Sequence, residues 1–405
     1  MKKKVLVISR FVPYDSVPHA GGKIHNFSIK KLNQEEEFDI KLLSFCKTYD
    51  LDKLDHNKYK LDSDIVCIDN VEFNTVKNNI LNAYYHYIPI STYASFGEYI
   101  IKKIIVKKLE EYKRLGYNPD IIMLEWTQIV IFAPLIKKIF SNSRLVAIEH
   151  DVTFQAFERR FENKKSILKK LVYFIRTEEL KKCELKALKK CDSIITFNEK
   201  DKNILKKNDI CNDIKVIAPY YQNFGVIKNR FKGKNLLFYG KMDRKENYLS
   251  CIWFIENVFN ELIQIDNSIK FYIVGYNPTR ELLKYQNNNI IITGFVNDPK
   301  QYFEQASCLV APLVLGAGIK IKILEAMYAG VLVLTNDIGI EGIPVIDKQH
   351  YFHCNTAEEY KQMLIKIFNH DIDVKQVSEN AREFLKKNFS VTNGYEILKK
   401  TLCEL

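Results

Sequence analysis

Glycine and proline are scarce in this sequence, with 15 glycines and 10 prolines among 405 residues. Such a composition, rich in phenylalanine and tyrosine, argues against a disordered chain or a fibrous repeat. Uninterrupted apolar runs of about twenty residues are also missing, so no membrane-spanning helix is predicted. The basic start is followed by an apolar run that stops at Ile8. This run is too short for a signal peptide, and a buried first strand explains it better.

Paired cysteines are missing as well. The nine cysteines are scattered, their number is odd, and no two form a Cys-x-x-Cys pair. This pattern predicts small core residues of a reduced, cytoplasmic protein without a cysteine metal site.

Acidic residues are outnumbered, with 61 Lys and Arg against 49 Asp and Glu, a formal net charge of +12. Two thirds of this excess lies in Arg159–Lys190, which holds twelve basic and four acidic residues. No nucleic-acid-binding motif accompanies it, so we expect no nucleic-acid partner. Apolar residues recur there at helical spacing, namely Leu168, Leu171, Val172 and Ile175. Two interpretations are open: a helix with a solvated basic face, or peripheral contact with the anionic inner face of a membrane.

The chain is long enough for two domains of roughly 200 residues each. Short apolar runs alternate with longer amphipathic segments, which is typical of parallel sheets with helices between the strands. The expected strands are Val5–Ser9, Ile40–Phe45, Ile65–Ile68, Ile121–Glu125, Arg144–Glu149 and Ser193–Phe197, then Asn235–Tyr239, Lys270–Val274, Ile290–Thr293, Cys308–Pro312 and Leu332–Asn336. These α/β series predict two Rossmann-like, doubly wound parallel-sheet domains facing each other across a cleft.

We expect the first domain to span residues 1–222, with the junction near Ala218–Gln222. The second domain should span 223–385. The end of the chain predicts two helices with a break around Phe389–Gly394, and the segment 386–405 should cross back to the first domain.

The strongest chemical signal lies after the expected strand at Cys308, in a glycine-containing loop and a helix expected from about Ile319 to Tyr328. Glycines in the loop allow a ligand to approach the backbone. Helix amides with Lys320 and Lys322 suit a diphosphate, and the two oxygens of Glu325 suit a ribose diol. The residues alone leave an alternative open, a core helix with two solvated lysines and a surface glutamate.

The stretch Gly-Ala-Gly-Ile-Lys-Ile-Lys-Ile-Leu-Glu-Ala-Met-Tyr-Ala-Gly, residues 316–330, is followed by Val-Leu-Val-Leu-Thr and then by Ile-Gly-Ile-Glu-Gly-Ile. It resembles the donor-binding signature of the retaining group 1 glycosyltransferases, family 4, which have the GT-B fold. This resemblance implies a UDP- or GDP-sugar as donor and co-substrate, no further cofactor and no metal.

Further motifs follow in the family's order, among them Leu237-Phe-Tyr-Gly-Lys-Met-Asp-Arg-Lys-Glu-Asn247 and Thr293-Gly-Phe-Val-Asn-Asp298. In the first motif, a glycine and a basic residue approach the phosphates. The candidates for this basic residue are Arg244, Lys245 and Lys241. In the second, the backbone contacts the base. The resemblance thus implies donor-binding roles for Gly240, Arg244, Lys245, Val296, Lys320, Lys322, Glu325 and Glu341.

The first half carries Pro18-His-Ala-Gly-Gly22, similar to the family's glycine loop over the donor diphosphate. The amides of Gly21 and Gly22 would bind the anion, although the residues alone allow a simple turn. Histidines 19 and 25 flank this loop and are expected to be incidental or to face the acceptor.

The resemblance also places His150 at the active site, hydrogen-bonded to the transferred sugar or the leaving phosphate. Asp151 would orient His150 or touch the acceptor. By itself, a histidine after a buried strand is more often structural.

One position departs from the family. Many members carry a glutamate where this chain has Ala317, so the contact to the sugar ring is unassigned. No Asp-x-Asp motif of the metal-dependent type appears in a plausible loop: Asp62-Ser-Asp64 has the spacing but is expected to precede a strand without partners, which does not suggest a metal site.

The expected reaction is sugar transfer to a glycan or lipid-linked acceptor in cell-surface polysaccharide or glycoconjugate synthesis, with retention of configuration. Two alternatives are a GT-B-fold sugar-nucleotide epimerase and a non-catalytic glycosyltransferase-like binding subunit. The sequence leaves the sugar, the base, the acceptor and the oligomeric state unassigned.

Overall fold

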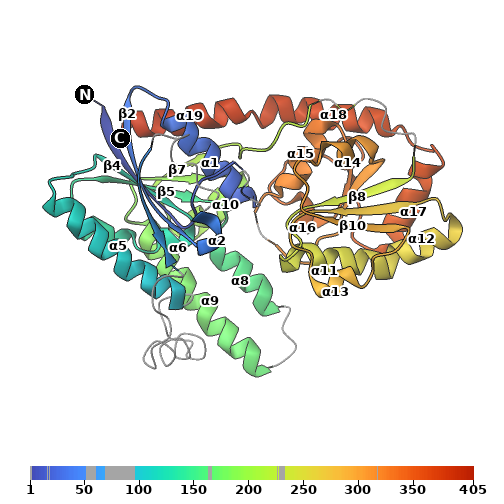
Figure 1. The fold of residues 1–405 in the computed structure, drawn as a ribbon, viewed down its shortest axis with the longest axis horizontal. Coiled ribbons are helices and arrows are strands. Elements are labelled where there is room, and N and C mark those ends of the chain that lie inside the picture. Colours follow the sequence, from blue (N-terminus) through green and yellow to red (C-terminus); the bar gives the residue numbers. More distant parts are fainter. Residues whose placement is uncertain are drawn as a thin grey trace. The chain divides into compact units, whose positions relative to one another are not determined.

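The structure is a computed structural model that describes residues 2–15, 17, 19–51, 61–68, 96–162, 167–225, 227, 233–316 and 318–405 (Figure 1). The chain forms two compact units. The first contains Met1–Val17, Gly21–Ile217 and Thr392–Leu405, and the second contains Pro18–Ala20 and Ala218–Val391. The chain thus passes between units after Ile217, at the start of the expected junction Ala218–Gln222.

The first unit has a seven-stranded, all-parallel sheet in the order β3-β2-β1-β4-β5-β6-β7. Two expected strands, Ile121–Glu125 and Arg144–Glu149, coincide with observed ones, and the others differ at their ends. The bounds are β1 Lys3–Ser9, β2 Phe38–Cys46, β3 Asp62–Cys67, β4 Ile121–Glu125, β5 Arg144–Glu149, β6 Ser193–Thr196 and β7 Asp213–Val216.

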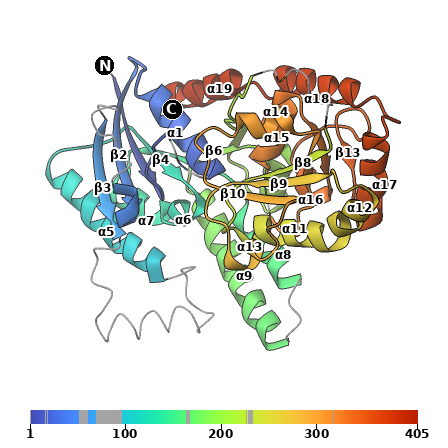
Figure 2. The ribbon, with the colours of Figure 1, turned by 45° about the vertical axis from the view of Figure 1, so that its right-hand side comes forward.

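Helices flank this sheet, and α8 and α9 project from it together in both ribbon views (Figures 1 and 2). Helix α19 belongs to the first unit, where Tyr395 Oη and Lys399 Nζ both donate to the Glu35 carboxylate at 2.9 and 2.6 Å. The bounds are α1 Ala20–Leu32, α2 Thr48–Leu51, α5 Phe96–Arg114, α6 Thr127–Val130, α7 Ala133–Ile139, α8 Thr153–Glu162, α9 Ile167–Leu188, α10 Glu199–Lys207 and α19 Val391–Glu404.

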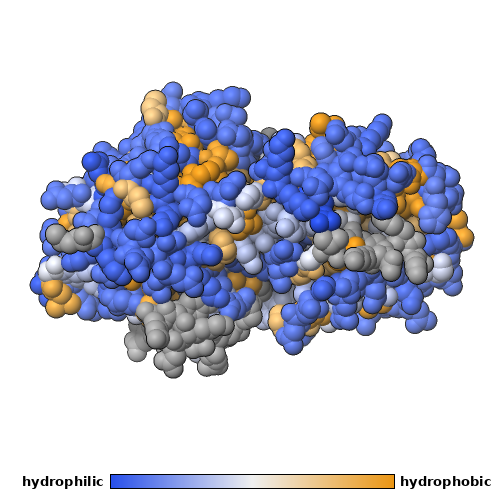
Figure 3. All heavy atoms as spheres, turned by 90° about the horizontal axis from the view of Figure 1, so that it is seen from above, coloured by the Kyte–Doolittle hydropathy of each residue, from blue (hydrophilic) through white to orange (hydrophobic). Residues whose placement is uncertain are grey.

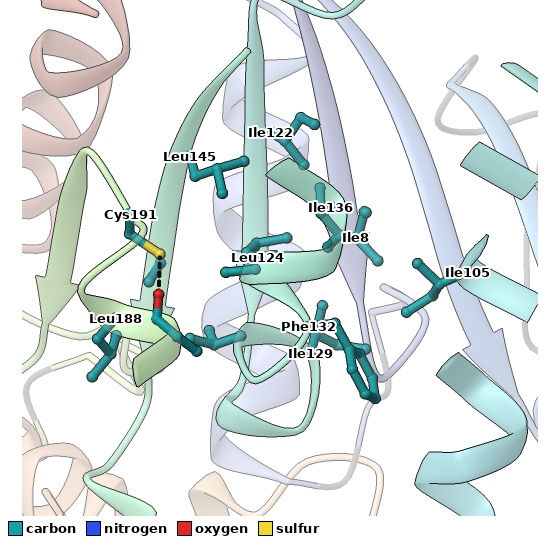
Figure 4. Packing of buried hydrophobic residues seen from close by; sticks show 14 of the residues in the cluster. Ile8, Ile105, Ile122, Leu124, Ile129, Phe132, Ile136, Leu145, Leu188 and Cys191 are labelled. Atoms are coloured by element: carbon teal, nitrogen blue, oxygen red, sulfur yellow. Dashed lines mark hydrogen bonds between the residues drawn. The ribbon is translucent and has the colours of Figure 1, made fainter. Parts of the chain in front are cut away.

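The core of the first unit forms where one face of the sheet meets the segment of α6 and α7 (Figure 4). Ile8 and Leu124 from the strands pack with Ile129, Phe132 and Ile136, and all five side chains are buried. Because both faces of the central strands are apolar, each face requires such a covering layer. This packing sets the positions of the residues at the ends of β1, β4 and β5.

The second unit has a six-stranded, all-parallel sheet in the order β10-β9-β8-β11-β12-β13. The sequence missed β13, whose two residues are too few for a recognisable pattern. The bounds are β8 Asn235–Tyr239, β9 Lys270–Val274, β10 Ile290–Gly294, β11 Cys308–Ala311, β12 Leu332–Thr335 and β13 Phe352–His353.

Helices and one π-helical segment, Ile255–Phe259, connect these strands. Helix α15 begins at Ile321, two residues later than expected, because Lys320 has extended backbone angles. The bounds are α11 Lys245–Phe254, α12 Asn260–Ile265, α13 Arg280–Leu283, α14 Lys300–Gln305, α15 Ile321–Ala329, α16 Asp337–Ile340, α17 Ala357–Phe368 and α18 Val374–Asn388.

The Asp-x-Asp spacing lies inside β3, so the expectation that it precedes a strand is wrong. Asp64 is also well partnered: Tyr112 Oη donates to its carboxylate, and Lys108 Nζ lies 3.4 Å from it. These contacts tie the edge strand β3 to α5.

Hydrophilic side chains cover most of the face shown in Figure 3, with apolar patches scattered among them. Scattered apolar exposure of this kind is normal for folded proteins. Among the helices of the described residues, none combines the length and the apolar composition that a membrane span requires.

Candidate active site

Doubly wound parallel sheets bind ligands outside the carboxyl ends of the strands, at the point where the strand order reverses. In the second unit this point lies between β8 and β11. Gly240 directly follows β8, and the loop that ends at Lys320 follows β11. In the first unit the reversal lies between β1 and β4, and Trp126 directly follows β4.

The backbone is tightly packed just beyond β8 and β9. Gly240 donates its N–H to the carbonyl oxygen of Val274 at 3.0 Å. A Cβ atom added to Gly275 would lie 1.6 Å from the carbonyl oxygen of Gly240, and both glycines have positive φ, +153° and +156°. No side chain fits between these loops, so the turn after β8 presents bare backbone, as phosphate-binding turns do.

A partly buried lysine lies beside this turn. Lys322 Nζ donates to Asn247 Oδ1 at 2.5 Å and stands 4.2 Å from the centre of the Phe238 ring. A Cβ atom on Gly240 would be 3.2 Å from the same Nζ. Burial lowers the pKa of Lys322 to about 8, although Cys251 and other acidic groups partly oppose this effect. The alternative of a solvated lysine is therefore wrong for Lys322.

The loop after β11 folds around a second lysine. Lys320 Nζ donates to the carbonyl oxygen of Gly318 and lies 3.7 Å from Glu341 Oε2. A Cβ atom on Gly316 would stand 3.1 Å from Lys320 Cε. Two predicted donor-binding residues, Lys320 and Glu341, are thus neighbours. Below, "lysine cluster" denotes Gly240, Asn247, Lys320 and Lys322.

Glu325 lies one turn further along α15 and is only 1% exposed, so the alternative of a surface glutamate is wrong. One carboxylate oxygen accepts a hydrogen bond from the backbone N–H of Gln222 at 3.3 Å. The residue thereby ties α15 to the stretch that opens the second unit. Its contact with a ribose diol stays a prediction.

The basic residues after β8 lie at the surface. Arg244 is the N-cap residue of α11 and pairs with Glu246, while Lys245 is the first helical residue. Lys241 Nζ stands 3.4 Å from Asp243 Oδ2. Their phosphate contacts also stay predictions.

Val296 lies half-buried in the loop after β10. Since β10 is two strands from β8, the usual strand spacing separates this loop from Gly240 by about 10 Å. Two exposed aromatic residues at the same edge, Tyr276 and Phe295, were not predicted from the sequence, and their rings meet edge to face at 6.2 Å. The position of Phe295 beside Val296 was the available signal.

In the first unit, one carboxylate contacts two histidines. His150 Nε2 lies 2.8 Å from Glu125 Oε2, and His25 Nδ1 lies 3.3 Å from Glu125 Oε1. Both Glu125 and His25 are buried. Burial would raise the pKa of Glu125, but the two imidazoles outweigh burial and hold it at about 2. The incidental or acceptor-facing role expected for His25 is therefore wrong.

Aromatic rings enclose the imidazole of His150. The Trp126 ring stacks on it with centroids 4.5 Å apart and an interplanar angle of 12°, and Phe197 lies at 5.2 Å. Trp126 has φ 71° and ψ 145°, a region that essentially only glycine populates. Such strain costs about 1–3 kcal/mol and tends to occur at functional sites. We name His25, Glu125, Trp126 and His150 the histidine cluster.

The first turn of α1 covers this cluster. A Cβ atom on Gly21 would lie 3.0 Å from Trp126 Nε1 and 3.3 Å from His150 Nδ1. Gly21 and Gly22 are helical residues, so the predicted glycine loop is wrong. Helix α1 begins at Ala20, and amides of a first helical turn lack acceptors within the helix. The two glycines thus lie at a helix start.

Asp151 does not hold His150, because Glu125 does, so the orienting role predicted for Asp151 is wrong. The Asp151 carboxylate instead accepts a hydrogen bond from Thr153 Oγ1 at 3.2 Å. The preceding Glu149 is buried and accepts from Thr127 Oγ1 at 2.6 Å. Burial raises the pKa of Glu149 to about 8, and Asp151 adds to the rise.

Several functional candidates escaped the sequence analysis. Glu125 is the last residue of an apolar strand, and Trp126 follows it. A polar residue at the carboxyl end of a strand was the signal that could have identified Glu125. Asn247 closes the Leu237–Asn247 motif without a role assigned to it. Ala317 lies outside the described residues.

Comparison with known proteins places these geometries in a family. Residues 233–370 match the family described as "Glycosyl transferases group 1". An uncharacterised glycosyltransferase from Methanocaldococcus jannaschii is 26% identical over an alignment of 291 residues that covers 64% of this chain and 68% of the relative.

Solved structures resemble the whole chain. Sucrose-phosphate synthase from Thermosynechococcus elongatus has a TM-score of 0.70 at 13% identity, covering 100% of this chain and 99% of that one. The Anabaena protein HepE has a TM-score of 0.67 at 10% identity, covering 100% of both chains. The resemblance to group 1 glycosyltransferases and the two-unit α/β fold inferred from the sequence are confirmed, whereas assignment to family 4 and retention of configuration stay predictions. Residues 233–370 are therefore similar to the group 1 glycosyltransferases, within a chain that has the GT-B fold.

Proposed function

We propose that this protein transfers a sugar from a nucleoside diphosphate sugar to a glycan or lipid-linked acceptor, with retention of configuration and without a metal. The observation that carries the proposal is the lysine cluster at the strand reversal of the second unit. There a cation is packed against a turn of bare backbone between Gly240 and Gly275. A diphosphate suits this combination of positive charge and unobstructed amides.

Charge development explains the demand for such a cluster. As the bond to the sugar breaks, negative charge builds on the leaving diphosphate. Lys320, Lys322 and the first amides of α15 supply preorganised positive charge for it. Lys322 gains most from an anion, because burial in the free protein disfavours its charged form. No metal is needed for this role, so we expect EDTA to leave the rate unchanged, and loss of activity would contradict the proposal.

In the first unit, His150 is the proposed contact to the transferred sugar or the leaving phosphate, with Gly21 and Gly22 at the start of α1 as anion-binding amides. Trp126 Nε1 and His150 Nδ1 both lie next to Gly21, which supports one small polar site there.

Relatives favour a uridine donor. The solved structures of HepE contain UDP and UDP-glucose, and a TarM structure contains UDP with α-GlcNAc-glycerol. We therefore propose a UDP-sugar for this chain. The exposed rings of Tyr276 and Phe295, near Val296, offer a stacking surface for the base.

Thermal unfolding in the presence of UDP- and GDP-sugars tests donor binding first. A ligand at a hundred times its Kd stabilises the folded state by about 2.7 kcal/mol. We expect UDP-sugars to raise the Tm more than GDP-sugars. Lys320→Ala and Lys322→Met should abolish the rise, and variants that bind and transfer like the wild type would overturn the assignment.

Two rivals predict different products. A sugar-nucleotide epimerase would change the donor without any acceptor, which chromatography of the donor after incubation detects. A non-catalytic subunit would bind UDP-sugar without releasing UDP under any acceptor condition. Release of UDP that depends on an added glycan or lipid-linked acceptor supports the transferase. The anomeric proton of the product, observed by NMR, then tests retention.

We also propose that α8 and α9 bind an anionic membrane surface at the cytoplasmic face, where a lipid-linked acceptor would lie. On α9, Leu171 and Phe174 are 57% and 49% exposed, and Lys182 is exposed on the same helix. Exposed apolar side chains on a helix that also carries exposed lysine suit the interface of an anionic bilayer.

Cosedimentation with vesicles tests this contact. We expect binding to vesicles that contain phosphatidylglycerol, little binding to phosphatidylcholine, and loss of binding in the double variant Leu171→Glu, Phe174→Glu. Equal binding of the two vesicle types, or none, supports the other interpretation, a solvated basic face.

A further inference from the structure

We infer that Glu125 is the positioning residue for His150: it fixes the imidazole with a hydrogen on Nε2 and leaves Nδ1 to meet an oxygen of the sugar nucleotide. The part of this inference that concerns the ligand rests on the proposed function, whereas the part that concerns the ring does not.

The first step is the hydrogen-bonding chemistry of Glu125. At neutral pH this residue is a carboxylate, since its pKa is held at about 2. An ionised carboxylate only accepts hydrogen bonds, so a ring nitrogen in contact with it must supply the hydrogen. His150 Nε2, at 2.8 Å from Glu125 Oε2, therefore carries a hydrogen.

The second step concerns the other oxygen. Glu125 Oε1 faces His25 Nδ1 at 3.3 Å, and His25 is completely buried. Among the ion pairs of the described residues, those of Glu125 are with His25 and His150. The carboxylate is thus held from both sides by imidazoles and cannot turn away from His150 without losing a partner.

The third step is the plane of the ring. Stacking on Trp126 and contact with Phe197 restrict tilting of the His150 imidazole. The hydrogen bond to Glu125 restricts rotation within that plane. Together they leave one orientation, in which Nδ1 points toward the first turn of α1.

The fourth step is the state of Nδ1. Within the described residues this atom is buried and has no hydrogen-bond partner. Buried polar atoms of native proteins are nearly always partnered, so an exception calls for an explanation. The atom lies where Gly21 has no side chain, beside Trp126 Nε1. A ligand hydroxyl entering there supplies the missing partner, because Nδ1 of a neutral ring with its hydrogen on Nε2 can only accept.

A spectroscopic experiment on the wild-type protein tests the position of the hydrogen without any variant of Glu125. Protein labelled with 15N-histidine is studied at neutral pH by long-range 1H–15N correlation, and His150→Asn identifies the signals of His150. We expect the Nε2 shift of a nitrogen that bears hydrogen. An Nε2 shift typical of a lone pair, or an average of the two tautomers, would overturn the inference.

Glu125→Gln then tests the positioning role. An amide both donates and accepts, so it no longer imposes a hydrogen on Nε2. We expect the Nε2 signal to move toward an average and kcat with UDP-glucose to fall about 10- to 100-fold, by analogy with the carboxylates that orient metal-ligating histidines. KM should change much less. Unchanged spectra and unchanged kcat would overturn the positioning role.

The matched control is Glu184→Gln. Glu184 is another buried glutamate of the first unit, whose carboxylate accepts from the N–H groups of Thr153 and Phe154 at 3.0 and 3.1 Å. The Glu184→Gln variant should leave the NMR signals of His150 unchanged. His150→Asn reports on the proposed function separately: wild-type transfer by this variant would refute the role of His150, while the spectra still decide the role of Glu125.

Discussion

Binding of UDP should draw protons onto Lys322. In the free protein burial lowers the pKa of this lysine to about 8, so about half of the molecules carry a neutral amine at pH 8. A diphosphate beside the amine favours the charged form. We therefore expect each UDP to bring about 0.5 proton at pH 8, about 0.1 at pH 7 and about 0.9 at pH 9.

Isothermal titration calorimetry measures this uptake. The apparent binding enthalpy is recorded in buffers with different ionisation enthalpies, and the slope gives the protons taken up per UDP. The Lys322→Met variant removes the titrating group and should show almost no uptake at pH 8. An uptake that is equal in the two proteins, or absent in the wild type at pH 9, would refute the argument.

The same lysine makes stability depend on pH. Its pKa is about 8 in the folded protein and ordinarily 10.5, so between these values the unfolded chain binds more protons and stability rises with pH. The difference corresponds to about 3 kcal/mol, an upper value because the side chain is partly exposed. Urea unfolding of wild type and Lys322→Met is measured at pH 7 and pH 10. The free energy of unfolding of the wild type, relative to that of the variant, should be higher at pH 10. The same difference between the two proteins at both pH values would contradict this prediction.

Four other substitutions, one of them a control, test the packing and the ionisation of residues in the two units. Gly275→Ala should cost about 3 kcal/mol or more, because its Cβ would lie 1.6 Å from the Gly240 carbonyl oxygen. The control is Gly294→Ala, where φ is +69° but a Cβ atom would meet nothing within 4 Å, so urea unfolding should show a loss of about 1–2 kcal/mol. Equal losses of stability in the two variants would contradict this reasoning. Gly21→Ala should slow UDP release from UDP-glucose several-fold while shifting the Tm little, since its Cβ crowds His150 Nδ1 at 3.3 Å; an unchanged rate would count against that site. Burial raises the pKa of Glu149 from 4.5 to about 8, so the folded state holds this proton longer and stability falls as pH rises between those values. The Tm of Glu149→Gln should exceed that of the wild type at pH 8.5, and this difference should shrink at pH 5. A difference in Tm that does not depend on pH would refute the prediction.

Sequence reasoning located most strands because their signal is local. A strand covered by helices on both faces needs apolar residues at nearly every position, and Ile121–Glu125 and Arg144–Glu149 show this pattern without reference to the rest of the chain. The strand Phe352–His353 was not predicted, because two residues are too few to show an alternating or continuous apolar pattern. The start of α15 was placed too early, since Lys320 is compatible with a helix and only its extended backbone excludes it.

At the candidate site, the sequence indicated residue types but not their partners. The family motif singled out Lys320, Lys322 and Glu325, yet only the position of Lys322 beside Phe238 and Asn247 shows that burial lowers its pKa. The hydrogen-bond partner of His150 could likewise not be identified from the sequence. Asp151 is its neighbour in the chain, whereas Glu125 is its neighbour across the sheet.

By itself the sequence determined the alternation of strands and helices, the two-unit α/β fold and the residue types of the group 1 motif, because these depend on composition and spacing within short segments. Only the tertiary structure decided that Glu125 joins His25 and His150, and that Gly240 and Gly275 exclude any side chain between them. These contacts join segments far apart in the chain, and they follow from which strands are neighbours. The order of strands is set by the packing of the whole unit, which no local pattern contains.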